Sequence, residues 1–125
     1  MWVITNFGFF SVVQKPDDAA GDTVTVRARV KSDLEALRQK YLPQLGKILQ
    51  DAGSDYKYRA KVLRSDFAIA QLHIVLDIDY SNFKDSVAKQ QGSARSHLYH
   101  KLWDVLYQLQ EVQPVTSPKP RTSYS

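Results

Sequence analysis

The stretch TVTVRARVK, residues 23–31, decides the fold, because every second side chain in it is apolar. Valine or alanine occupies each even position, and threonine, arginine or lysine each odd one, which is the two-residue period of a strand with one buried face. Residues 56–63, YKYRAKVL, repeat the pattern, with tyrosine, alanine and valine alternating with Lys57, Arg59 and Lys61. The two stretches therefore predict strands that turn one face toward helices and leave the cationic side chains facing water.

Two short strands are expected at the start of the chain, over 2–4 and 9–14, where aromatic and β-branched residues prevail. Gly8 lies between them and marks a turn or a bulge. Residues 15–22 contain proline, aspartate and glycine, which predicts a loop before the strand at 23–31.

Helices are expected in the rest of the chain. One begins at Ser32, which has the spacing of a capping box with Glu35, and ends at Pro43, with a short extra turn over 45–49. Others are expected over 82–90 and 94–112. The stripe that the last helix is expected to bury consists of Leu98, Leu102, Val105, Leu106 and Leu109.

Residues 66–78 fit two patterns. Leucine and isoleucine alternate with other residues from Leu72 to Ile78, as in a strand. Ser65 and Asp66 form a good helix start, however, and the alanines and glutamine that follow are poor strand residues, so we predict a helix.

This order of elements predicts an α+β fold with two layers. We expect a small antiparallel sheet of three to four strands, packed on one face by three to four helices, in a single domain over 1–112. Residues 113–125 contain three prolines and almost no large apolar side chain, which predicts a flexible tail.

Composition narrows the class of protein. The 125 residues include no cysteine, which excludes disulfides and thiolate metal sites and favours a reducing compartment. The start MWVITNFGFF lacks the basic region and the cleavage site of a signal peptide, and no apolar run reaches the roughly 18 residues of a membrane span. We expect a cytoplasmic protein with no membrane partner. The net charge of +4 permits an anionic partner without requiring one.

A cationic strand face is the first candidate site. Its members are Arg27, Arg29, Lys31, Lys57, Arg59 and Lys61, and Phe7 and Phe9 are expected to join the same outer face. Cations that neutralise phosphate beside rings that stack on bases are typical of single-stranded nucleic-acid binding. A solvated face that only maintains solubility, or one covered by the last helix, is the favoured interpretation, because the chain has no RNP-like aromatic motif.

A polar cluster is the second candidate. It comprises Asp79, Tyr80, Asn82, Phe83, Lys84, Arg95, His97, Tyr99 and His100, grouped around two expected helix starts. Free amides at a helix start favour anions, so Lys84 and Arg95 could hold a phosphate or a carboxylate there. The structural interpretation is favoured: Ser81 or Asn82 caps the helix, Phe83 lies in the core and Tyr80 covers the next helix.

Metal and catalytic chemistry have little support. His97 and His100 share a helix face, but only His73 or Asp104 offers a third ligand, so we predict no metal site. The chain has no phosphate-binding glycine motif and no nucleophile motif, and we predict neither a cofactor nor catalytic residues. An enzyme built on Lys84, His97 and His100 is the weakest hypothesis.

Aromatic residues on the last helix suggest an interface. Tyr99, Trp103 and Tyr107 exceed what a small core needs, and such residues are favoured where proteins meet. A homodimer through the last helix and simple packing on the sheet are equally compatible with this pattern.

Two motifs carry a resemblance. One is the start, Met1-Trp2 followed by GFFSVV at 8–13, and the other is DYSNFK at 79–84 followed by HLYHKLW at 97–103. Over residues 1–110 the chain resembles a group of small bacterial proteins without an assigned function. The resemblance implies a bacterial domain and supplies no catalytic residue.

The sequence thus predicts a non-catalytic binding or interaction domain that associates with itself or with a protein partner. Binding of single-stranded nucleic acid or a nucleotide on the cationic face is the alternative.

Overall fold

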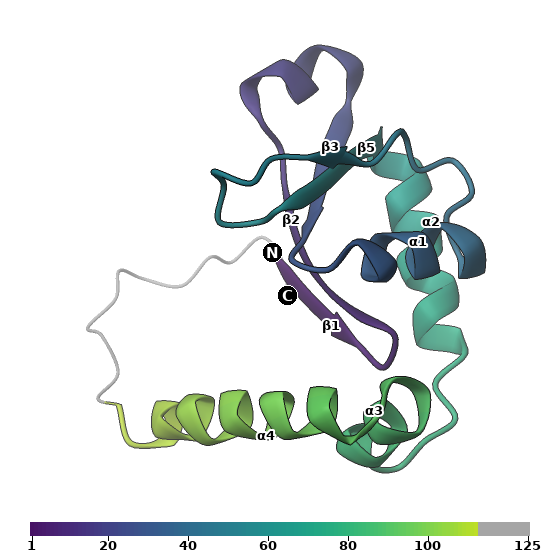
Figure 1. The fold of residues 1–125 in the computed structure, drawn as a ribbon. Coiled ribbons are helices and arrows are strands. Elements are labelled where there is room, and N and C mark those ends of the chain that lie inside the picture. Colours follow the sequence, from purple (N-terminus) through teal and green to yellow (C-terminus); the bar gives the residue numbers. More distant parts are fainter. Residues whose placement is uncertain (113–125) are drawn as a thin grey trace, which may run out of the picture.

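A computed structural model describes residues 1–112, and the tail predicted over 113–125 lies outside the described residues (Figure 1). The strands are β1 (Trp2–Thr5), β2 (Gly8–Val13), β3 (Thr23–Ala28), β4 (Leu49–Gln50) and β5 (Tyr58–Leu63). The α-helices are α1 (Lys31–Lys40), α2 (Arg64–Leu76), α3 (Phe83–Gln91) and α4 (Ser93–Tyr107). Two short 3-10 helices are η1 (Pro16–Gly21) and η2 (Gln108–Gln110). The fold is α+β, as predicted.

The sheet has five strands in the order β1-β2-β3-β5-β4, and every neighbouring pair is antiparallel. The prediction of three to four strands was wrong because β4 is only two residues long, too short to show a period. An extra helical turn was expected over 45–49, and β4 overlaps that segment at Leu49. Pairing with Arg59 and Tyr58 of β5 holds Leu49 and Gln50 extended.

The hydrophobic core lies between one face of the sheet and the helices α1 and α2. The register aligns Val12 with Val26 and Val26 with Ala60, so that alternate side chains of three strands share the buried face. Leu34 and Leu37 of α1 are fully buried against them. The predicted inward face is therefore confirmed within β3 and β5, but Val30, beyond the end of β3, is 40% exposed.

The start of α1 differs from the prediction. The helix begins at Lys31, its N-cap is Val30, and no side chain caps it, so the expected Ser32 capping box is absent. Strand β3 ends at Ala28, before it can pair with the Phe9 amide of β2. The carboxylate of Asp33 accepts that amide hydrogen bond instead, at 3.0 Å. A tertiary contact thus determines the geometry of this helix start.

Residues 64–76 form the helix α2, which confirms the preferred interpretation of the ambiguous segment. Phe67 and Ala70 face the core. The strand-like alternation arose because the opposite side of α2 is also apolar, with Ile69, Leu72 and Leu76 exposed.

The helices α3 and α4 form a hairpin outside this core. Gly92 joins them with φ +94°, a conformation that a side chain would strain. Neither helix contributes a residue to the core cluster. Instead, α4 lies beside Ile4 and Phe9, which share the opposite face of the sheet, and it runs past β1 away from α1 and α2 (Figure 1). The expectation that all helices pack on one face holds only for α1 and α2.

Candidate functional site

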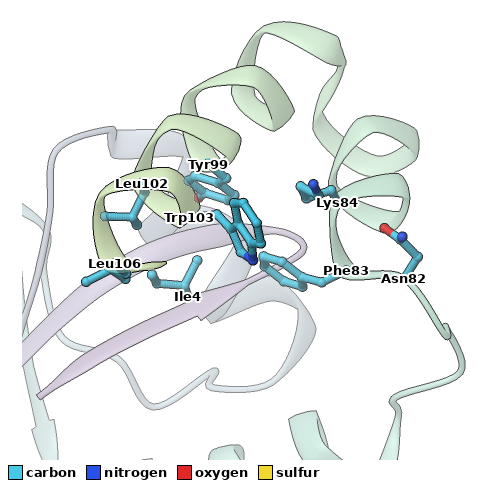
Figure 2. A pocket seen from close by; sticks show the side chains of 8 residues that line it. All are labelled: Ile4, Asn82, Phe83, Lys84, Tyr99, Leu102, Trp103 and Leu106. Carbon is cyan, nitrogen blue, oxygen red and sulfur yellow. The ribbon is translucent and has the colours of Figure 1, made fainter. Parts of the chain in front are cut away.

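A cavity of about 320 Å³ lies between α3, α4 and β1 (Figure 2). Its lining residues are Ile4, Asn82, Phe83, Lys84, Tyr99, Leu102, Trp103 and Leu106. Five of these positions belong to the expected polar cluster or to the aromatic flank of the last helix. The cavity is walled mainly by hydrocarbon and aromatic rings, with the Lys84 amine as its cationic group.

The hairpin geometry brings the aromatic rings together. The ring of Phe83, at the first position of α3, stacks on that of Tyr99 with centroids 6.1 Å apart and planes 9° apart. The ring of Tyr80 lies 6.2 Å from Phe83. Asn82 caps α3 by accepting the Asp85 amide at 3.0 Å. Asn82 therefore begins the helix that holds Phe83 and Lys84 at the cavity.

Lys84 occupies the rim of the cavity. Its Nζ lies 3.1 Å from Nδ1 of His100 and 5.4 Å from the centre of the Trp103 ring. Within residues 1–112, Lys84 forms no ion pair. The imidazole of His100 stacks on Trp103, and its Nε2 lies 3.6 Å from Asp104. A cation thus stands beside an apolar cavity without a carboxylate partner in this part of the chain.

Arg95 has a different role from the anion ligand that the sequence suggested. Its guanidinium binds both carboxylate oxygens of Asp33, at 2.9 and 3.1 Å, and also donates to the Tyr99 hydroxyl. Hydrogen bonding to Asp33 raises the pKa of Arg95 above its already high ordinary value, despite the opposing effect of burial. Burial raises the pKa of Tyr99, partly opposed by Arg95. Arg95 attaches α4 to α1 and has little capacity for a ligand.

His97 does not join the cavity. It is exposed on α4, and the described residues give it no hydrogen bond or ion pair. The structure therefore brings Asn82, Lys84 and His100 together, whereas Arg95 points to Asp33. Within residues 1–112, no three histidine or acidic side chains are grouped closely enough to hold a metal ion.

The cationic strand face is partly covered. The guanidinium of Arg27 donates to Ser11 at 2.6 Å, and Arg27 and Arg29 lie over the ring of Tyr56 at 4.6 and 4.2 Å. Arg59 donates to the side chain of Ser54. Tyr56 was expected in the core, but it lies outside the core cluster beneath these guanidinium groups.

Acidic residues of η1 neutralise part of this face. Lys61 forms ion pairs with Asp18 at 2.6 Å and with Asp17 at 3.2 Å. Burial alone would raise the pKa of Asp18, but hydrogen bonds from Lys61, Thr23, Thr25 and the Lys15 amide lower it well below the ordinary carboxyl value. Hydrogen bonding to Asp18 in turn raises the pKa of Lys61. The two aspartates in the Pro-Asp-Asp sequence at 16–18 were the only local indication of carboxylates near the cationic face. Nothing in the local sequence showed that this segment folds over the sheet.

Of the remaining cationic candidates, Lys31 is the first residue of α1, so its expected place on a strand was wrong, and Arg29 and Lys57 lie at the edges of that face. Arg29 is exposed and also lies 5.8 Å from the ring of Phe9, which faces outward as expected. Lys57 is exposed and lies 5.7 Å from the ring of Tyr58. Phe7, in contrast, is buried in the core against Phe10, so its expected place on the outer face was wrong.

Among residues 1–112, an apolar face of α4 and one of α2 are exposed, which the sequence did not predict. The stripe of α4 that was expected to be core is half-buried only at Leu102. Leu98 and Val105 are each 59% exposed and Leu109 is 66% exposed. The face of α2 formed by Ile69, Leu72, Val75 and Leu76 is also exposed. Periodicity correctly identified apolar stripes but not whether this chain covers them.

Within residues 1–112, no helix combines the length and the apolar character needed to cross a membrane. In comparisons with known proteins, no family model, curated protein or solved structure matches this chain.

Proposed function

We propose that this chain is a non-catalytic interaction domain that associates with a second copy of itself through the outer stripe of α4. We define this outer stripe as Leu98 and Val105 of α4, Leu109 of η2 and Val112, which follows η2; all four are exposed. Leu98 and Val105 are seven residues apart, which is two helical turns, and therefore lie on the same side of α4. The exposure of this stripe is the observation that carries the proposal, because soluble monomers rarely leave large contiguous apolar patches in water.

A second copy suits the stripe because of the charges beside it. Lys101 lies near the middle of α4, whereas Asp104 and Glu111 lie toward and beyond its end. In an antiparallel pair, Lys101 of one copy can lie beside an acidic residue of the other, and the two helix dipoles also oppose each other favourably. A two-fold interface of this kind buries the same stripe on both copies.

Sedimentation equilibrium at tens of micromolar protein tests the proposal. We expect twice the chain mass of 14.3 kDa for the wild type and a monomer for Val105→Glu, because a buried charge in the stripe opposes pairing. Leu72→Glu places the same charge on the exposed face of α2 and should remain a dimer. Far-ultraviolet circular dichroism should show that both variants keep the fold.

A wild-type monomer at this concentration would contradict the proposal. A dimer that Leu72→Glu abolishes and Val105→Glu leaves intact would assign the interface to α2 instead. The orientation can be tested separately, since the chain has no cysteine of its own. A mixture of Leu98→Cys and Leu109→Cys proteins should form the mixed disulfide in preference to either symmetric one.

Single-stranded nucleic-acid binding remains the alternative proposal, with narrower support. Arg29 and Lys57 are exposed cations near an outward-facing Phe9. However, Lys61 already has two carboxylate partners. The ring of Tyr56 is buried, so a base cannot stack on it. At most a small part of the expected surface therefore favours phosphate.

A further inference from the structure

We propose that the cavity between α3, α4 and β1 binds a small aromatic monocarboxylate, with its ring among the aromatic side chains and its carboxylate on Lys84. This site is separate from the outer stripe of α4, because none of the stripe residues lines the cavity. The inference therefore does not depend on self-association.

The shape of the cavity favours a small, largely apolar ligand. Its volume of about 320 Å³ lies at the lower end of the range for small-molecule sites, roughly 300–1,000 Å³. Ile4, Leu102 and Leu106 supply aliphatic walls, and Figure 2 shows them opposite the rings of Phe83 and Trp103. The cavity is open to solvent, since Trp103 is 52% and Leu106 44% exposed. A ligand that covers these apolar walls with a hydrocarbon surface removes them from water and thereby gains free energy.

The aromatic walls favour a flat ring over a flexible chain. Phe83 and Tyr99 are already stacked in parallel, and Trp103 lies against His100 and Tyr107, with ring centroids 5.9 and 5.3 Å apart. These mutual contacts hold the rings in place before a ligand arrives. A planar ligand can then make offset or edge-to-face contacts without the entropy cost of ordering the site.

The charge at the rim selects a carboxylate. An ammonium group has three donors, and the Nζ of Lys84 has one partner among the described residues, the Nδ1 of His100 at 3.1 Å. A carboxylate can accept from the remaining donors while its ring lies in the cavity. A phosphate monoester suits the site less well, because its second charge would need another cation and the nearby Arg95 is held by Asp33.

This site can be tested by titrating the protein with phenylacetate and with its uncharged analogue phenylacetamide. Binding is monitored by nuclear magnetic resonance, through the indole N–H signals of the two tryptophans. Trp103 lines the cavity and Trp2 does not, so Trp2 is an internal control. We expect phenylacetate to shift the Trp103 resonance saturably and to bind at least tenfold more tightly than phenylacetamide. The Trp2 resonance should not follow the same binding curve.

The Lys84→Met variant keeps most of the side-chain length but removes the amine, so it should bind the two compounds equally weakly. Lys89→Met removes the same charge from an exposed position on α3 outside the cavity lining, and should keep the tenfold preference. Val105→Glu should also keep it, which separates this site from the dimer interface. Failure of phenylacetate to shift Trp103, an equal affinity for both compounds in the wild type, or a preference that survives in Lys84→Met would each overturn the proposal.

Discussion

Asp18 shows most clearly how one residue organises a loop and a sheet face. Its side chain is fully buried and accepts hydrogen bonds from the Lys15 amide, the hydroxyls of Thr23 and Thr25, and the ammonium of Lys61. These donors fix η1 over β3 and β5. They stabilise the ionised form, which explains the lowered pKa.

We predict that Asp18→Asn lowers the free energy of unfolding by about 2–3 kcal/mol at neutral pH, because an amide cannot accept all of these bonds. The neighbouring Asp17→Asn should cost less than about 1 kcal/mol, since Asp17 is exposed and pairs only with Lys61. Urea unfolding of both variants measures the difference.

The pH dependence of this effect follows from the lowered pKa. The unfolded state takes up the proton first, so the contribution of Asp18 is full well above the ordinary carboxyl value of 3.8 and is lost as pH falls below it. The stabilities of wild type and Asp18→Asn should therefore converge in acid. A gap that stays constant down to the acid unfolding of the wild type would contradict this account.

At the scale of elements, the α3–α4 hairpin depends on a few polar contacts with the rest of the chain. Asp33 and Arg95 form the most buried of these, and Gln91 donates to the Asn6 carbonyl at 2.9 Å. The side chain of Asn6 donates to Ser86 at 2.9 Å. Because the hairpin contributes nothing to the core cluster, these contacts carry much of its attachment.

We predict that Asp33→Asn loosens α3 and α4 before the sheet. The amide oxygen can still accept from Phe9, but Arg95 loses its charged partner, which costs roughly 3–5 kcal/mol for a buried pair. Hydrogen exchange should accelerate in α4 while β3 and β5 stay protected. Adding Arg95→Met to the Asp33→Asn variant should restore part of the lost stability, because the double variant has no unpaired guanidinium. Equal acceleration in the sheet and the hairpin would show that they unfold as one unit.

At the scale of the whole molecule, the distribution of charge limits what the net charge of +4 can do. Lys61 and Arg95 are paired with carboxylates, and Arg27 and Arg59 are half-buried beside Ser11 and Ser54. Of the six cationic candidates, Lys31 belongs to α1 and not to the sheet. Among the other five, only Arg29 and Lys57 are both exposed and without a carboxylate partner in the described residues.

We predict that any binding to a labelled single-stranded oligonucleotide depends weakly on salt. With two phosphates neutralised, the logarithm of affinity falls with a slope of about −1.4 against the logarithm of salt, or about sevenfold between 50 and 200 mM. Fluorescence anisotropy over that range measures the slope, and an Arg29→Gln, Lys57→Gln double variant should remove the binding. A slope steeper than about −3 would show that the paired cations also bind phosphate.

Local patterns in the sequence were sufficient for the element types. Alternation at 23–31 and 56–63 correctly predicted strands there, because a strand with one buried face has a two-residue period. The strands are shorter than predicted, and Val30 and Tyr56, which lie outside β3 and β5, do not join the core cluster. Alanine content and a helix start likewise outweighed the alternation near α2. At the candidate site, local spacing placed Asn82 and Lys84 near a helix start, which the structure has at Phe83.

Only the tertiary structure decided what each apolar or charged side chain meets. Asp18 and Lys61 are 43 positions apart and Asp33 and Arg95 are 62 apart, so no local period connects either pair. The outer stripe of α4 looks the same in sequence whether the chain's own sheet or another copy covers it. A periodic pattern of apolar residues indicates that one face of an element avoids water. Only the tertiary structure determines which surface covers that face.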